Sequence, residues 1–301
     1  DMVHRLIEKE RAKFILTGSS ARKLKRGAAN LLAGRATVYE LFPLTRLELG
    51  ERFNLIEYLH WGGLPTIYHL RTDQERRDYL RSYVLTYLNE EIRAEQIVRR
   101  LDPFRSFLPI AGQVSGKVIN HSRIASEVGT DTKTIQAYFQ VLEDTLLGFY
   151  LPGFHQSPRK SQRISPKFFL FDTGIKKALE GSLDARPVES TSAFGELFES
   201  MVILEVFRLN RYWQKDYQLS YYATKSGVEI DLVLSKGSKH KFVEIKSSKK
   251  INESEVRSLA RNTRDLTDSK NVFYLSRDPV PQKIEGVSCL PWEAIYEPSF
   301  W

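Results

Sequence analysis

Two segments toward the end of the chain alternate apolar and polar residues with the period of a β-strand. Residues 227–234 read Gly-Val-Glu-Ile-Asp-Leu-Val-Leu, and residues 242–246 read Phe-Val-Glu-Ile-Lys. The sequence Lys-Gly-Ser-Lys at 236–239 has the composition of a turn, so the pattern predicts a β-hairpin. Alternation is expected to place four apolar side chains on one face of the first strand: Val228, Ile230, Leu232 and Leu234.

The polar residues of this hairpin form a candidate catalytic set. Alternation turns Asp231 away from the apolar face of its strand and places Glu244 and Lys246 together on the second strand. Carboxylate oxygens bind Mg²⁺ or Mn²⁺, and a lysine can orient water and counter charge during phosphodiester cleavage. Asp followed by Glu-x-Lys resembles the signature of the PD-(D/E)xK nuclease superfamily. The alternative interpretation is a charged, solvated strand face that discourages aggregation.

That resemblance implies a further acid on a helix before the hairpin. Residues 195–207 carry apolar side chains at helical spacing and predict such a helix. Glu199 is the predicted third acid, holding the metal or its waters, and Glu196, one turn away, is the alternative.

The elements around the hairpin predict an α/β module built on a mixed sheet. After a polar linker at 182–192, the module at 190–301 is expected to contain these elements in order: helix 195–211, strands 217–224, 228–235 and 241–247, helix 253–264, strand 271–276, and a strand or short helix near 287–296. This order is similar to that of the restriction-endonuclease-like fold, in which residues 271–276 would form a buried parallel strand.

The middle of the chain predicts a helical, winged-helix-like module at 69–181. Residues 79–99 have a helical pattern, and three further helices are expected at 104–111, 120–129 and 133–147, followed by a strand from Phe149. Helix, glycine-containing turn and helix is the helix-turn-helix arrangement. The buried stripe of the last helix is expected to be Ile135, Phe139, Leu142 and Leu146.

This module offers two candidate DNA-contacting groups. One lies at the start of the third helix and comprises Lys133, Thr134, Gln136 and Tyr138. The other is a basic stretch comprising Arg159, Lys160, Arg163, Lys167, Lys176 and Lys177, which would supply sequence-independent phosphate affinity. A packing module that contacts another protein is the alternative interpretation.

Residues 12–20 predict a short apolar strand that ends in Thr-Gly-Ser-Ser, which presents Thr17 and Ser19 at its carboxyl end. This strand resembles the sensor-1 strand of AAA+ ATPases, whose polar tip reads the γ-phosphate. Together with Leu-Ala-Gly-Arg at 32–35, Gly-Gly-Leu-Pro at 62–65 and the acidic set, it resembles prokaryotic predicted AAA+ ATPases with the C-terminal domain of unknown function 4143. The resemblance implies that residues 1–68 are the end of an ATPase domain, with Arg35 as a phosphate-sensing or structural residue.

The phosphate-binding motifs of such an ATPase are missing from these 301 residues. No Gly-x-x-x-x-Gly-Lys-Ser/Thr loop occurs, since Ser-Gly-Lys at 115–117 lacks the first glycine and precedes Val118. The family would place this phosphate-binding loop (Walker A) and the acidic Walker B strand upstream of residue 1. We therefore expect a fragment that does not hydrolyse ATP, and ATP would be bound only by the intact family member.

Composition narrows the range of partners. The net charge of +8 suits a polyanion such as DNA, although self-association or a protein partner is also compatible. A single cysteine, Cys289, excludes an internal disulfide and fits a reducing cytoplasm. No run of 18 apolar residues occurs, so no membrane partner is expected.

Overall fold

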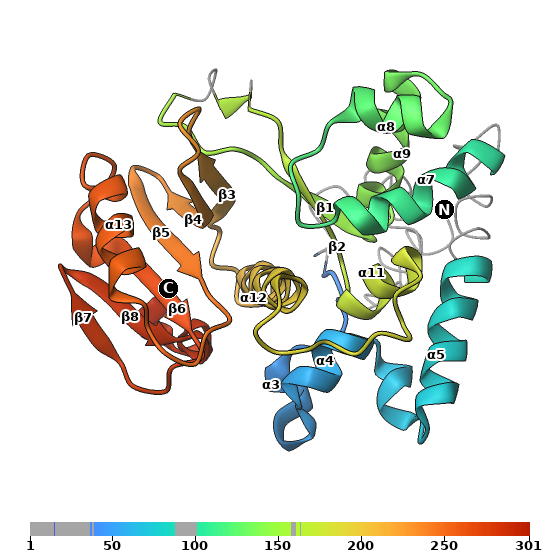
Figure 1. The fold of residues 1–301 in the computed structure, drawn as a ribbon, viewed down its shortest axis with the longest axis horizontal. Coiled ribbons are helices and arrows are strands. Elements are labelled where there is room, and N and C mark those ends of the chain that lie inside the picture. Colours follow the sequence, from blue (N-terminus) through green and yellow to red (C-terminus); the bar gives the residue numbers. More distant parts are fainter. Residues whose placement is uncertain (1–14, 16–36, 38, 88–100, 158–160, 163) are drawn as a thin grey trace, which may run out of the picture.

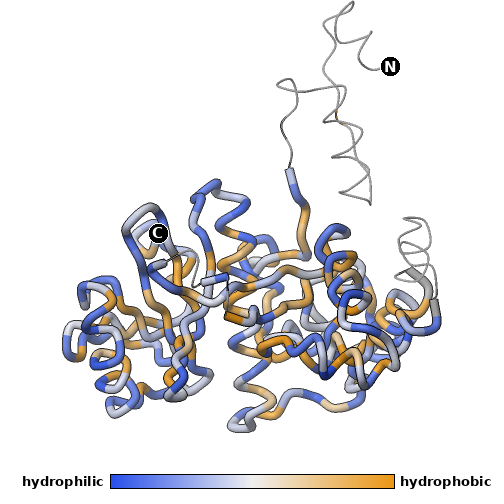
Figure 2. Tube along the Cα trace, turned by 90° about the horizontal axis from the view of Figure 1, so that it is seen from above, coloured by the Kyte–Doolittle hydropathy of each residue, from blue (hydrophilic) through white to orange (hydrophobic). Residues whose placement is uncertain are grey.

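The computed structural model describes residues 15, 37, 39–87, 101–157, 161–162 and 164–301. Its centre is α12 (Ser192–Tyr212), a long helix that lies between a β-sheet and a helical region (Figure 1). Hydrophobic segments gather in the interior of both parts, and hydrophilic segments lie at their outer turns (Figure 2). The fold is therefore mixed α/β, as predicted.

The sheet contains six strands in the order β3-β4-β5-β6-β8-β7. Both antiparallel and parallel neighbours occur, because β5 and β6 are joined through α13 (Glu253–Thr263) and run in parallel, whereas β4 and β5 form a hairpin. The mixed sheet predicted from the sequence is confirmed. Its strands have these bounds: β3 Gln218–Ala223, β4 Glu229–Lys236, β5 Lys239–Ile245, β6 Val272–Ser276, β7 Gln282–Ile284 and β8 Val287–Pro291.

The two faces of the sheet are buried against different helices. On one face, Leu232 and Val243 share a core with α12 residues such as Met201. On the other face, Val233 and Phe242 pack with residues of α13. Burial on both faces explains why β6 reads as a continuous apolar run rather than as an alternating one.

The hairpin forms where the sequence predicts it, but its first strand is irregular. Gly237 occupies the turn between β4 and β5 with a φ of 60°. The register with β3 shifts between Ser220 and Tyr222, whose partners Val233 and Ile230 are three residues apart. This β-bulge breaks the alternation, so the predicted single face was wrong: Ile230 packs in the α13-side core, opposite Leu232.

The helical region contains α7 (Leu101–Val114), α8 (His121–Val128) and α9 (Thr132–Asp144), followed by the antiparallel pair β1 (Gly148–Leu151) and β2 (Lys167–Leu170). Gly129 ends α8 in a left-handed conformation, and Asp131 caps α9 by accepting a hydrogen bond from the Thr134 backbone. These boundaries agree with the sequence pattern.

The third helix ends three residues before its predicted end. Leu146 has a φ of 61°, and the Leu147 N–H donates to the Leu142 carbonyl, as in a Schellman termination. Leu146 therefore lies outside the helix and does not extend its buried stripe. The helix expected at 79–99 is seen as the end of α5 (Asp73–Ser82) and a π-helical turn at Tyr83–Tyr87, and the remainder lies outside the described residues.

The segment predicted as a linker is fastened to the helical region. Asp184 forms an ion pair of 2.8 Å with Arg77 on α5, and Arg186 forms one of 2.6 Å with Glu57 on α4 (Leu55–Trp61). Just before it, α11 (Thr173–Glu180) packs against both α4 and α7. Within the described part of the chain, no helix is both long and apolar enough to cross a membrane.

Candidate functional site

Three predicted residues lie close together where β4 and β5 run side by side. Asp231 comes from β4, Glu244 from the end of β5, and Lys246 directly follows β5. The Lys246 backbone N–H still donates to the Leu275 carbonyl on β6 at 2.8 Å, which fixes the chain just beyond the strand. The side chains are thus presented from an ordered sheet rather than from a free loop.

Asp231 is the most deeply placed acid of this group. It is 7% exposed, and its Oδ2 accepts a hydrogen bond of 2.7 Å from the Ile245 backbone N–H. Burial raises the pKa of Asp231, while Lys246 and the Ile245 N–H act in the opposite direction. Its position beside the bulge of β4 is one that a regular strand would not give.

Glu244 and Lys246 form an ion pair that uses only one of the two carboxylate oxygens of Glu244. Lys246 Nζ lies 2.5 Å from Glu244 Oε1, whereas Glu244 Oε2 is buried and has no hydrogen-bond partner among the described residues. Burial and repulsion by Asp231 raise the pKa of Glu244 to about 7, against the attraction of Lys246. Burial lowers the pKa of Lys246, but Asp231 and Glu244 outweigh it, so its pKa is raised.

Glu199 reaches the same region from α12, but its carboxylate has another partner. Lys167 Nζ on β2 lies 3.4 Å from Glu199 Oε1 and 2.5 Å from Glu229 Oε1. Burial, followed by repulsion from Asp231, raises the pKa of Glu199 to about 8, and Lys167 opposes the rise. The alternative helix acid, Glu196, is half exposed and pairs with Lys117 at 3.5 Å.

Lys167 is the site residue that sequence reasoning missed. Its sequence neighbours predicted a phosphate-binding stretch, but Lys167, Lys176 and Lys177 are only 4–7% exposed. Lys176 pairs with Glu180, and Lys177 donates to the Ala185 carbonyl at 2.9 Å. These three lysines were therefore wrongly included in the basic stretch predicted to bind phosphate, because they are buried and pair with groups of the chain itself.

The surroundings of the site are polar and open on one side. A pocket of about 540 Å³ is lined by Lys246, Ser247, Ser248, Lys250 and the start of α13. Among the described residues, no group of three His, Cys, Asp or Glu side chains is arranged to hold a metal ion. Asp231 and Glu244 therefore stand as a pair of potential ligands, with Glu199 held apart by Lys167.

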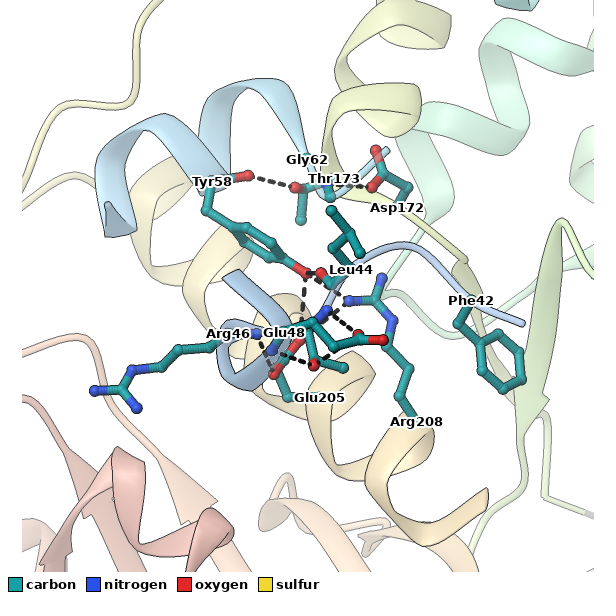
Figure 3. A network of polar contacts seen from close by, with 12 residues as sticks. Phe42, Leu44, Arg46, Glu48, Tyr58, Gly62, Asp172, Thr173, Glu205 and Arg208 are labelled. Carbon is teal, nitrogen blue, oxygen red and sulfur yellow. Dashed lines mark hydrogen bonds and ion pairs between the residues drawn. The ribbon is translucent and has the colours of Figure 1, made fainter. Parts of the chain in front are cut away.

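A buried polar network holds the middle of α12 against the segment around Tyr58 and Arg46 (Figure 3). Glu205 accepts hydrogen bonds from Tyr58 at 3.2 Å and from the Arg46 backbone at 3.1 Å. Arg208 donates to Tyr58 Oη at 2.5 Å and pairs with Glu205 at 3.1 Å. Glu205 and Arg208 lie about two turns of α12 beyond Glu199. The network therefore connects the helix that carries Glu199 to the segment around Arg46.

The Gly-Gly-Leu-Pro sequence belongs to the same supporting structure. Gly62 ends α4 with a φ of 76°, and a Cβ there would lie 2.0 Å from Asp172 Oδ1. The Gly63 N–H donates to Asp172 Oδ2 at 2.7 Å, and Asp172 also caps α11 through the Ile175 N–H. The motif is thus a close contact between helices and lies outside the acidic site.

The predicted DNA-contacting residues of α9 are only partly available. Lys133 and Gln136 are exposed, and Thr134 is half-buried with its hydroxyl bonded to Asp131 at 2.6 Å. Tyr138 was wrongly placed on the exposed side, because it is 6% exposed and packs edge-on against Phe104.

Arg159, Lys160 and Arg163 lie outside the described residues, as do the nucleotide-sensing candidates Thr17, Ser19 and Arg35.

Comparison with known families divides the chain into three consecutive parts. An AAA domain matches residues 1–50, a domain of unknown function (DUF8612) matches 52–186, and a domain of unknown function (DUF4143) matches 194–295. The matches support an AAA-like, ATPase-associated family with a DUF4143 domain. This agrees with the resemblance seen in the sequence. The acidic site lies in the DUF4143 part, and Lys167 reaches it from the DUF8612 part.

Similar proteins are themselves uncharacterized. An uncharacterized protein of Mycobacterium tuberculosis is 26% identical over 223 residues, which cover 72% of this chain and 50% of that protein. An uncharacterized protein of Haemophilus influenzae is 22% identical over 212 residues, covering 65% of this chain and 51% of that protein. The chain spans about half the length of these curated relatives. No solved structure matches it significantly.

Proposed function

We propose that the DUF4143 part of this chain is a nuclease-like module that cleaves DNA with Mg²⁺ or Mn²⁺, within an ATPase-associated protein. The observation that carries the proposal is that Glu244 Oε2 is a buried carboxylate oxygen without a hydrogen-bond partner among the described residues. The neighbouring carboxylate of Asp231 also repels the negative charge of Glu244. A buried acceptor left unsatisfied is costly in a folded protein, and a bound cation would satisfy it.

The donor set fits a hard divalent cation. Mg²⁺ commonly keeps several waters and uses one or two protein carboxylates together with substrate phosphate oxygens, so Asp231 and Glu244 suffice. When bound, the metal would polarise the phosphodiester and lower the pKa of water. Lys246, on the rim of the pocket, would then exchange its contact with Glu244 for a phosphate oxygen or the attacking water.

DNA is the proposed substrate because of charge and the helical region. The chain carries a net charge of +8 and exposes Lys133 and Gln136 on α9, which follows α8 through a short turn in a winged-helix-like order. A non-catalytic DNA-binding or protein-interaction module is the second candidate. The observation that favours it is that Lys246 and Lys167 already neutralise Glu244 and Glu199.

The test is plasmid nicking by the full chain in Mg²⁺ or Mn²⁺, compared with DNA affinity in EDTA. Lys246→Met and Glu244→Gln are expected to abolish nicking and to leave affinity within a few-fold, because both residues act on charge that develops during cleavage. Lys239→Met, an exposed lysine at the far end of β5, is the matched control and should retain activity.

The non-catalytic alternative has its own expected result. It would be favoured if single-stranded, duplex and branched DNA all stay intact in both metals, also with a longer relative that carries the nucleotide motifs and is supplied with ATP. Cleavage by the longer protein with ATP, but not by these 301 residues, would instead place the nuclease under ATPase control.

A further inference from the structure

Lys167 lies inside the candidate site although it comes from a strand that precedes the DUF4143 part. Its side chain is 6% exposed, and its ammonium contacts Glu229 at 2.5 Å and Glu199 at 3.4 Å. A lysine buried to this extent has no freedom to follow a phosphate group on the surface. Its partners are therefore the carboxylates of the chain itself.

The ammonium is held in place by the packing around it. Lys167 Nζ lies 5.3 Å from the centre of the Tyr221 ring, and Tyr221 Oη donates to the Ser165 carbonyl at 2.6 Å. The Tyr221 backbone also bonds to Pro152 at 3.0 Å and Phe154 at 2.6 Å. These bonds fasten the segments around β1 and β2 to the edge strand β3, so Lys167 is a fixed charge.

The site carries more carboxylates than ammonium groups. Lys167 and Lys246 lie among Glu199, Glu229, Asp231 and Glu244. Glu255 on α13 adds a further negative charge near Glu244 and Lys246. A divalent ion at Asp231 and Glu244 would relieve the repulsion between these two acids, whereas Lys167 already supplies the positive charge at Glu199 and Glu229.

We propose that the ammonium of Lys167 takes the place of a second metal ion, so that the site binds a single divalent cation at Asp231 and Glu244. This inference rests on the metal site of the proposed function. Sites with two metals hold the ions about 3.5–4 Å apart through shared carboxylates. Here the acid available for a second ion, Glu199, is paired with Lys167, and Lys167 is a positioning residue that keeps Glu199 away from the metal.

The experiment counts Mn²⁺ bound to the full chain by equilibrium dialysis and by electron paramagnetic resonance, which detects coupling between neighbouring Mn²⁺ ions. The wild type and Lys167→Arg are expected to bind one uncoupled ion. Lys167→Ala is expected to bind two, and Mn²⁺ should raise its Tm more than that of the wild type. The control is Lys117→Ala, which removes the lysine paired with Glu196 one turn away on α12 and should bind one ion.

A second variant keeps the test decisive if Lys167→Ala does not fold. Glu199→Gln is expected to bind one Mn²⁺ with a loss of affinity below about tenfold, the smallest loss usual for an outer-shell partner. A larger loss would bring Glu199 into the metal site, as a ligand or as an outer-shell partner, and overturn the inference. So would two ions in the wild type, or one ion in folded Lys167→Ala. A wild type that binds no Mn²⁺ would overturn the metal site itself, and the inference with it.

Discussion

At the scale of single residues, the molecule depends on contacts that allow no extra atom. Gly62 has a positive φ and lies against the buried carboxylate of Asp172, which in turn caps α11. We expect Gly62→Ala to cost more than about 2 kcal/mol of unfolding free energy, because backbone strain and steric overlap add together. Urea denaturation monitored by circular dichroism would measure the loss.

The matched control for this substitution is Gly129→Ala. Gly129 also has a positive φ, of 73°, but a Cβ there meets no atom within 4 Å. Its cost should be the strain alone, on the order of 1 kcal/mol. Equal costs for the two variants would show that overlap with Asp172 does not matter.

His60 gives a prediction about pH. It is 1% exposed, lies edge-on against Trp61, and burial lowers its pKa to about 4, with help from Lys177 and Arg186. The unfolded chain protonates this histidine below its ordinary pKa of 6.5, and the folded chain does not, so stability falls between pH 6.5 and 4.

The contribution of His60 to this loss is at most about 3.5 kcal/mol, since its pKa differs between 6.5 and about 4 and each pKa unit corresponds to about 1.4 kcal/mol. His60→Gln should flatten the curve of unfolding free energy against pH across that window, whereas the exposed His69→Gln should leave its slope unchanged. A wild-type curve as flat as that of His60→Gln would contradict the assignment.

At the scale of elements, α12 connects the acidic site to the rest of the molecule. Its N-terminal half carries Glu199, and the turns beyond it carry Glu205 and Arg208, which contact Tyr58 in the buried network. We expect Arg208→Met to cost about 3–5 kcal/mol, because it leaves Glu205 buried without its cation. Thermal unfolding would report the loss.

A second variant separates charge from packing in this network. Arg208→Met combined with Glu205→Gln removes both charges, so it should recover part of the lost stability. The exposed pair on α8, Arg123 and Glu127, supplies the control, since Arg123→Met should cost less than about 1 kcal/mol. No recovery in the double variant would show that packing, rather than charge, sets the cost.

At the scale of the whole molecule, the excess of basic residues predicts DNA binding that depends on salt. Neutralising phosphates releases counterions, so affinity should fall steeply as salt rises. Replacing the exposed Lys133 and Gln136 by Ala should weaken binding if α9 enters a groove. Fluorescence anisotropy across a salt series would measure both effects.

The control for this substitution lies on another exposed helix. Replacing Arg257 on α13, which pairs with Glu253 on the surface, should leave the DNA affinity within about twofold. Unchanged affinity for the Lys133 and Gln136 variant would instead assign the helical region to a protein contact.

Periodicity and turn chemistry determined most of the elements from the sequence by itself. The β4–β5 hairpin, α12, α13, and the helices α8 and α9 with their caps at Gly129 and Asp131 all form close to the predicted bounds. These features depend on local preferences, which neighbouring residues encode directly. The pairing of Glu244 with Lys246 belongs to the same class, since both lie on one short segment.

Tertiary structure alone decided the surroundings of the acids. The bulge that sends Ile230 to the opposite face depends on the register with β3, and alternation within β4 gives no sign of it. Lys167 lies 32 residues before Glu199 in a basic stretch of the sequence. Its burial depends on the packing of β2 beside α12, which the local pattern does not encode. Local pattern fixes what a segment becomes, whereas the charge of a site depends on which distant segments the fold brings together.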